Sequence, residues 1–211
     1  MNTESLTLTQ AVPAMLDGSA PGGVLMNAMI NQIGCGLLAC DRDGRLLFAN
    51  RTAQRELEAG RVLALRDQWV RGTDAGHAEF QMALREAADR QRARLLQLGD
   101  EGERTMLAVT PIWEPSLNHR VALVMIGQRL PGSALALQML ALRQGLTQTE
   151  TRVLAALLAN QKASEIAQSH GVGLATVRTQ IQSVRNKFGV RSIDALLLQV
   201  AALPPITTAV H

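Results

Sequence analysis

The chain has 211 residues, of which 47% are hydrophobic, and its formal net charge is +3. This length suits two small domains that can each bury a core, and the composition is that of a globular protein. The N-terminus lacks the basic stretch and apolar run of a signal peptide, and no apolar run approaches the about 20 residues of a membrane span. We therefore expect a cytoplasmic protein with no membrane partner.

The charge is distributed unevenly along the chain. Residues 1–145 contain 15 Lys and Arg against 15 Asp and Glu, whereas residues 146–211 contain 6 against 3. Both lysines, Lys162 and Lys187, lie in this C-terminal third. A local excess of positive charge favours phosphate binding, and a dimer would double it.

Cys35 and Cys40 are the only cysteines. If both lie on one strand, their odd separation points them to opposite faces, so they cannot form a disulfide. No cluster of Cys and His completes a metal site. We expect two buried free thiols, no metal and no identifiable cofactor.

The first 130 residues predict a flexible lead-in followed by a mixed α and β domain. Residues 1–23 are polar and turn-forming, and the pattern changes at Val24. Asp41-Arg42-Asp43-Gly44 is a hairpin signal. The elements expected over residues 24–130 are helices at 24–30, 50–57 and 75–92, and strands at 36–40, 45–49, 94–98, 105–112 and 121–126.

This order resembles a PAS sensor domain. The likeness depends on Asp41, Gly44, Asn50, Ala53 and Leu57 in the segment CDRDGRLLFANRTAQREL. It implies an antiparallel sheet with helices, in which a small-molecule effector or a protein partner could bind, although no residue identifies the ligand. An unrelated α+β domain with the same order of elements is the alternative.

Residues 131–145 predict a linker helix. Pro131-Gly132-Ser133 interrupts the last strand, and Ser133 can cap a helix from Ala134 to Gln144 that Gly145 ends. This helix is too apolar to stand alone. We expect it to pack against the sensor domain or against its twin in a dimer.

Residues 146–203 predict an all-α domain of four short helices, followed by a tail at 204–211. Thr147 and Glu150 form a capping box at the start of the first helix, and Asn160 is expected to end it. Glu165 opens a short second helix. A longer third helix ends at Phe188, and Ser192 caps the last one.

The third helix has one apolar face and one polar face. Val177, Ile181, Val184 and Phe188 recur at the spacing of a buried stripe. The opposite face carries amides, hydroxyls and arginines and no acid. Such a helix fits the major groove of DNA, where arginine and glutamine can each make two hydrogen bonds to a base edge. An ordinary solvated helix in a bundle is the alternative.

The segment LTQTETRVLAALLANQKASEIAQSHGVGLATVRTQIQSVRNKFGV resembles the LuxR/FixJ-type helix-turn-helix across all four helices. The resemblance implies that Arg178, Thr179 and Gln182 read bases. It also implies contacts to the DNA backbone from Lys162, Thr176, Arg185 and Lys187. The chain departs from the family pattern at Asn160, Lys162, His170, Gly173 and Gln180, which affects the expected sequence preference.

The sequence therefore predicts a sequence-specific DNA-binding transcription regulator that acts as a homodimer and is modulated by its N-terminal domain. In the resembled family the last helix helps to form the dimer, so Leu197 and Leu198 are the candidate interface residues; packing into their own domain is the alternative. A second hypothesis is an anti-activator that pairs with a related factor instead of DNA. No nucleophile–base pair or phosphate loop predicts an enzyme.

Overall fold

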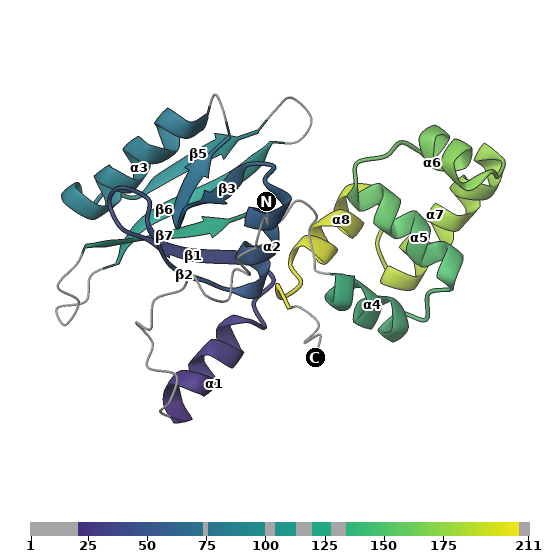
Figure 1. The fold of residues 1–211 in the computed structure, drawn as a ribbon. Coiled ribbons are helices and arrows are strands. Elements are labelled where there is room, and N and C mark those ends of the chain that lie inside the picture. The colour runs from purple at the N-terminus through teal and green to yellow at the C-terminus, as the bar shows by residue number, and fades with distance from the viewer. Residues whose placement is uncertain (1–20, 74–75, 100–103, 113–119, 128–133, 207–211) are drawn as a thin grey trace, which may run out of the picture. The chain divides into compact units, whose positions relative to one another are not determined.

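The computed structural model describes residues 21–73, 76–99, 104–112, 120–127 and 134–206 (Figure 1). The chain divides into two compact units, Met1–Gln128 and Arg129–His211. Most of the expected lead-in at 1–23 and the Pro131-Gly132-Ser133 break lie outside the described residues.

The N-terminal unit is built on an antiparallel sheet of five strands in the order β2-β1-β7-β6-β5. The strands are β1 (Gly36–Cys40), β2 (Leu46–Ala49), β5 (Arg94–Leu98), β6 (Thr105–Ile112) and β7 (Val121–Ile126). The helices are α1 (Pro21–Ile30), α2 (Arg51–Ala59) and α3 (His77–Arg90). The predicted α+β domain with an antiparallel sheet is confirmed.

The core of this unit lies between one face of the sheet and helices α2 and α3. Alternate strand residues such as Leu38 and Val124 point inward, because side chains on a strand alternate between its two faces. They pack with Leu57 of α2 and with Phe80 and Leu84 of α3. This face is therefore covered by helices.

The residues that carry the PAS resemblance have defined structural roles. Asp41 accepts hydrogen bonds from the backbone N–H of Asp43 and Arg45 at 3.0 and 2.8 Å, which closes the β1–β2 turn. Gly44 has a φ of +97°, and a Cβ there would lie 3.0 Å from the Val70 carbonyl. Asn50 is fully buried and caps α2 by accepting from the Ala53 N–H at 2.9 Å.

A short hairpin was not predicted from the sequence. Strands β3 (Leu63–Arg66) and β4 (Trp69–Gly72) pair through the two-residue loop Asp67–Gln68. Both loop residues have positive φ, 49° and 69°, as a type I′ turn requires. The usual Asn-Gly signal is missing here, so the sequence gives no turn to recognise.

Four other elements of this unit differ from prediction in their bounds. Helix α2 runs from Arg51 to Ala59 instead of 50–57, because Asn50 is its N-cap and not its first residue. Helix α1 begins at Pro21, three residues before the predicted start, because proline fits the first turn of a helix. Strand β2 begins at Leu46, and α3 runs from His77 to Arg90 and is shorter than expected.

Both cysteines are free. Cys40 is fully buried, and burial raises the pKa of its thiol far above the ordinary range. Cys35 precedes β1 and is only partly buried, which corrects the expectation of two buried thiols; burial raises its pKa as well. Over the ranges given above, no helix is long and apolar enough to cross a membrane.

The C-terminal unit is entirely helical. Its helices are α4 (Ala134–Arg143), α5 (Gln148–Leu158), α6 (Ala163–His170), α7 (Leu174–Phe188) and α8 (Ile193–Ala201). Val153, Ile166, Val177 and Leu196 are fully buried members of one core to which α5, α6, α7 and α8 all contribute. Asn160 follows α5 with a φ of 60°, as expected for a residue that ends a helix.

Candidate nucleic-acid interface

Helices α6 and α7 are joined by a tight turn. Gly171 ends α6 in the left-handed region with a φ of +66°, and Gly173 begins α7 with extended backbone. Helix α6 begins at Ala163, earlier than the predicted opening at Glu165, because the Glu165 carboxylate accepts from the Lys162 backbone N–H at 2.7 Å. Two helices of 8 and 15 residues thus form a helix-turn-helix.

Helix α7 buries one face and exposes the other. Its buried residues are Val177, Ile181, Val184 and Phe188, as the sequence stripe predicted. The three predicted base-reading residues, Arg178, Thr179 and Gln182, are all exposed. Gln182 lies four residues after Arg178 and three after Thr179, so the three side chains lie on one side of the helix, which can enter a groove with its polar atoms outward.

Arg178 and Gln182 both keep hydrogen-bonding capacity for a ligand. Arg178 makes no hydrogen bond or ion pair with any residue that the structure describes. Gln182 donates from Nε2 to Asn186 Oδ1 at 2.8 Å, which leaves its second N–H and its carbonyl oxygen free. Those two groups are the pair that recognises adenine N7 and N6. Asn186 thereby orients the Gln182 side chain, a role that the sequence did not indicate.

Thr179 is oriented by its own helix. Its hydroxyl donates to the Ala175 carbonyl at 3.0 Å, so the oxygen can still accept and the methyl group can contact a thymine methyl.

Two of the residues predicted to contact the DNA backbone have exposed side chains. Lys162 and Thr176 are exposed near the N-termini of α6 and α7. No side chain caps α7 at Gly173, so the first N–H groups of α7 have no side-chain partner at that cap. A helix N-terminus with open N–H groups attracts phosphate.

The other two predicted backbone contacts, Arg185 and Lys187, are bound within the domain. Arg185 donates from Nη2 to the Arg191 carbonyl. Lys187 donates from Nζ to the Gly145 carbonyl at 2.8 Å and to Glu150 Oε2 at 2.6 Å. An ammonium has three N–H groups, so Lys187 keeps one for a phosphate.

Glu150 is the centre of a buried polar network, of which the sequence predicts only the capping box with Thr147. Its carboxylate accepts from the Thr147 N–H at 2.7 Å, which completes the predicted capping box, and from the Ser183 hydroxyl at 2.6 Å. Burial raises its pKa, but the hydrogen bonds from Lys187, Ser183 and Thr147 outweigh burial, and the pKa falls from 4.5 to about 2. The network fixes α7 to the start of α5.

The two candidate interface leucines differ in exposure. Leu197 packs partly against the core of the domain, whereas Leu198 is 73% exposed. Met139 and Leu142 of α4 are exposed as well.

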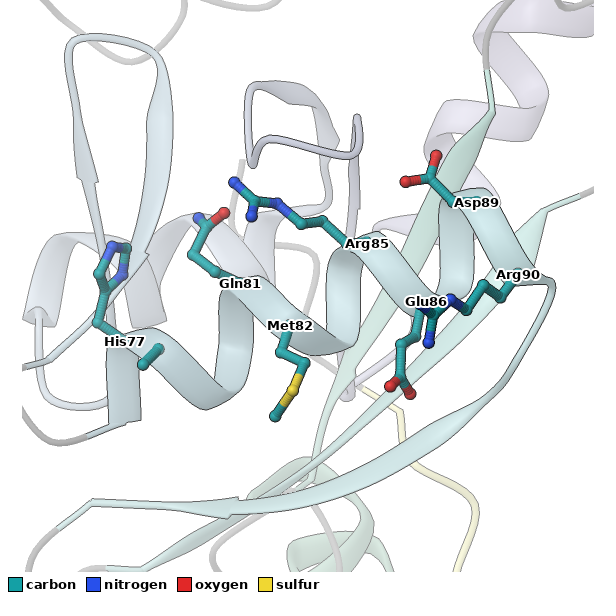
Figure 2. Close-up of a pocket in the computed structure, with 8 residues that line it drawn as sticks. His77, Gln81, Met82, Arg85, Glu86, Asp89 and Arg90 are labelled. Carbon is teal, nitrogen blue, oxygen red and sulfur yellow. The ribbon is translucent and has the colours of Figure 1, made fainter.

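A groove of about 620 Å³ runs along α3 in the N-terminal unit (Figure 2). Its lining is mostly polar or charged, and its acids are paired: Glu86 with Arg94 at 2.5 Å, and Asp89 with Arg42 at 3.4 Å. Small-molecule sites have mainly apolar walls. The groove therefore does not identify an effector.

Comparisons with known proteins agree with this geometry. Residues 144–200 match the family described as bacterial regulatory proteins, luxR family. Three solved structures are similar to the chain at low identity. A Vibrio cholerae VqmA–ligand–DNA complex is 21% identical, with 87% of this chain and 90% of that chain covered and a TM-score of 0.40.

A phage VqmA–DPO complex is 19% identical, with 86% and 91% covered and a TM-score of 0.34. The PAS domain of nitrogen regulation protein NR(II) from Vibrio parahaemolyticus is 14% identical, with 49% and 97% covered and a TM-score of 0.32. No curated protein matches the chain. Residues 144–200 therefore form a helix-turn-helix domain of the luxR family of bacterial regulatory proteins.

Proposed function

We propose that the chain is a sequence-specific DNA-binding transcription regulator that acts as a homodimer. The observation that carries the proposal is the outer face of α7, where Arg178, Thr179 and Gln182 are exposed at helical spacing while the opposite face is buried. Arg178 would bond a guanine, and Gln182 an adenine, because each can make two hydrogen bonds to that base.

The phosphate contacts hold α7 in the groove. Lys162 and Thr176 would bind phosphates at the N-termini of α6 and α7, where the helix dipoles also favour an anion. Lys187 contributes the one N–H left by Glu150 and Gly145. Arg185 donates one N–H to the Arg191 carbonyl, and the N–H groups left on its guanidinium would contact the DNA backbone.

The dimer contact is assigned to the exposed side of α8. Leu198 would form its centre and the half-buried Leu197 its margin. Two α7 helices about 34 Å apart would then read a partly palindromic site, one half-site each. The N-terminal domain would modulate this pairing in response to an effector or a protein partner.

The test is selection of binding sites from a random duplex pool by the full chain at a fixed salt concentration. Arg178→Ala is then expected to weaken the selected site by about 1–3 kcal/mol and to relax preference at one base pair. Arg152→Ala is the matched control, because it removes the same charge from an exposed position on α5.

The control variant Arg152→Ala is expected to change the affinity for all DNA sequences by the same factor. If Arg178→Ala also weakened every sequence equally, Arg178 would be a phosphate contact. If no duplex were enriched, DNA binding would be refuted, and pairing with a related factor would take its place.

A further inference from the structure

Gln182 and Asn186 form a pair of amides on the exposed face of α7. They lie four residues apart, which places them on the same side of the helix. Gln182 Nε2 donates to Asn186 Oδ1 at 2.8 Å, and both residues are exposed. No other residue that the structure describes bonds the Gln182 side chain. The two amides therefore meet the base edges as one unit when α7 enters a major groove.

The bond to Asn186 decides which polar groups Gln182 offers to a base. A primary amide has two N–H donors and one carbonyl acceptor, whereas Oδ1 of Asn186 can only accept. The bond therefore turns the nitrogen of Gln182 toward Asn186 and leaves one N–H and the carbonyl oxygen for the base. In the major groove, adenine presents an acceptor at N7 beside a donor at N6, whereas guanine presents two acceptors. Gln182 held in this way fits adenine, and at guanine its oxygen would face another oxygen.

The N6 donor of adenine is also an atom that DNA methylation changes. N6 carries two hydrogens, of which one pairs with O4 of thymine and the other points into the major groove. When a methyl group replaces one hydrogen and the base pair stays intact, the methyl group takes the place of the groove hydrogen. The Gln182 carbonyl then faces a methyl group and is left without a hydrogen bond in the interface, which costs binding energy.

Two features prevent Gln182 from avoiding such a methyl group. Asn186 holds the Gln182 amide, so turning the amide over would set its oxygen against Oδ1 of Asn186. The helix cannot retreat on its buried side, because Val177, Ile181 and Val184 are packed in the core of the domain. Moving the whole domain outward would lengthen the contacts of Arg178 with the bases as well.

We infer that the chain binds its DNA site tightly only when the adenine that Gln182 reads is unmethylated at N6. The inference rests on the proposed function and adds regulation at the same surface. The ligand is a duplex in which that adenine carries a free N6 amino group, and methylation of the base releases the regulator. Asn186 is the positioning residue that fixes this response. The signal acts on the C-terminal unit directly and needs no effector in the N-terminal unit.

Duplexes that carry a modified base test the inference. The adenine is identified first, as the base pair whose preference is lost when Gln182→Ala is compared with the wild type in the DNA selection. N6-methyladenine is then placed at that adenine in each half-site, or at an adenine outside both half-sites as the control. The dissociation constant of the full chain is measured for each duplex by fluorescence anisotropy at one salt concentration.

Methylation inside the half-sites should raise the dissociation constant by about 5- to 150-fold for each half-site, because one base contact loses its hydrogen bond. Methylation outside the half-sites should leave the constant unchanged. Equal constants for the methylated and unmethylated sites would overturn the inference. A guanine at the position that Gln182 reads would overturn it as well.

The Gln182→Ala variant separates the lost hydrogen bond from a change in the DNA itself. N6-methylation also alters the duplex, and the wild type and the variant both experience that alteration. Because Gln182→Ala has no side-chain carbonyl to lose a partner, we expect methylation to leave its dissociation constant nearly unchanged. A methylation effect as large in the variant as in the wild type would refute the inference.

Two substitutions at Asn186 test its positioning role. Asn186→Asp keeps only acceptors, so it should retain the adenine preference and the methylation effect, although its charge weakens binding to every duplex. Gln168→Glu, at an exposed position on α6, is the matched control for the added charge. Asn186→Ala frees the Gln182 amide to turn over, so guanine should compete with adenine and the methylation effect should shrink. The wild-type preference and methylation effect in Asn186→Ala would exclude the role of Asn186.

The DNA selection tests the proposed function before any modified duplex is used. If the wild-type chain selects a site whose affinity does not respond to methylation, this inference fails and the proposed function stands. If no duplex is enriched, the proposed function itself fails.

Discussion

Replacing Glu150 by glutamine should lower the stability of the C-terminal unit while leaving the side-chain volume almost unchanged. The side chain is 6% exposed and bonds Thr147, Ser183 and Lys187. Lowering its pKa from 4.5 to about 2 corresponds to about 3 kcal/mol of stability at neutral pH. Because the Lys187 side chain is 30% exposed, solvent screens part of its attraction to Glu150. We expect a loss of about 2–3 kcal/mol.

The sign of the pH dependence follows from the direction of the pKa change. The pKa of Glu150 is lower in the folded state, so its ionised carboxylate stabilises the fold fully above about pH 4.5. This stabilisation is lost as the pH falls toward 2. About 1.4 kcal/mol should remain at pH 3. The difference between the wild type and Glu150→Gln should therefore be largest at neutral pH and shrink in acid.

Hydrogen exchange with peptide resolution measures this within the full chain. At neutral pH, peptides from α5 and α7 of Glu150→Gln should lose protection by about 30- to 150-fold. Glu165→Gln is the matched control, because Glu165 is exposed and its carboxylate bonds the Lys162 backbone alone among described residues. A loss for Glu150→Gln no larger than the control, or one that is the same at pH 3, would refute the reasoning.

Three other substitutions test the packing of the N-terminal unit and the proposed contact of Lys162 with DNA. Asn50→Ala removes a buried cap with four backbone hydrogen bonds and should cost the N-terminal unit about 2–4 kcal/mol in urea unfolding followed by the fluorescence of Trp69 and Trp113, which both belong to this unit; a loss under about 1 kcal/mol would contradict this. Phe80→Ala leaves a cavity at a fully buried position and should cost about 3–5 kcal/mol by the same assay, with an unchanged midpoint contradicting the packing. Lys162→Gln should reduce the slope of log affinity against log salt by about 1 per half-site, and an unchanged slope would remove Lys162 from the interface.

The sequence was most informative where local rules decide the structure. Strands β1, β5, β6 and β7 have the predicted bounds, because each alternates between a helix-covered face and an outer face. The stripe on α7 likewise predicted which of its residues are buried. Caps at Thr147 and Ser192 follow from side chains that bond the backbone three residues on.

The sequence was uninformative where distant residues decide. Glu150 was recognisable as half of a capping box, but its partner Lys187 lies 37 residues further on and meets it only in the folded domain. From the sequence alone, Lys187 is therefore indistinguishable from a free cation that binds phosphate. The β3–β4 hairpin was missed for another reason, since Asp67 and Gln68 adopt a turn that their types do not favour.

The contact between Lys187 and the Gly145 carbonyl has a mechanical consequence. Gly145 lies two residues after the end of α4, and Lys187 belongs to the last turn of α7, so one ammonium joins the α4–α5 connection to the C-terminal end of α7. When α4 is displaced, either the bond to the Gly145 carbonyl breaks and Lys187 stays bonded to Glu150, or the C-terminal end of α7 moves with α4. A displacement of α4 therefore reaches the C-terminal end of α7 through one hydrogen bond.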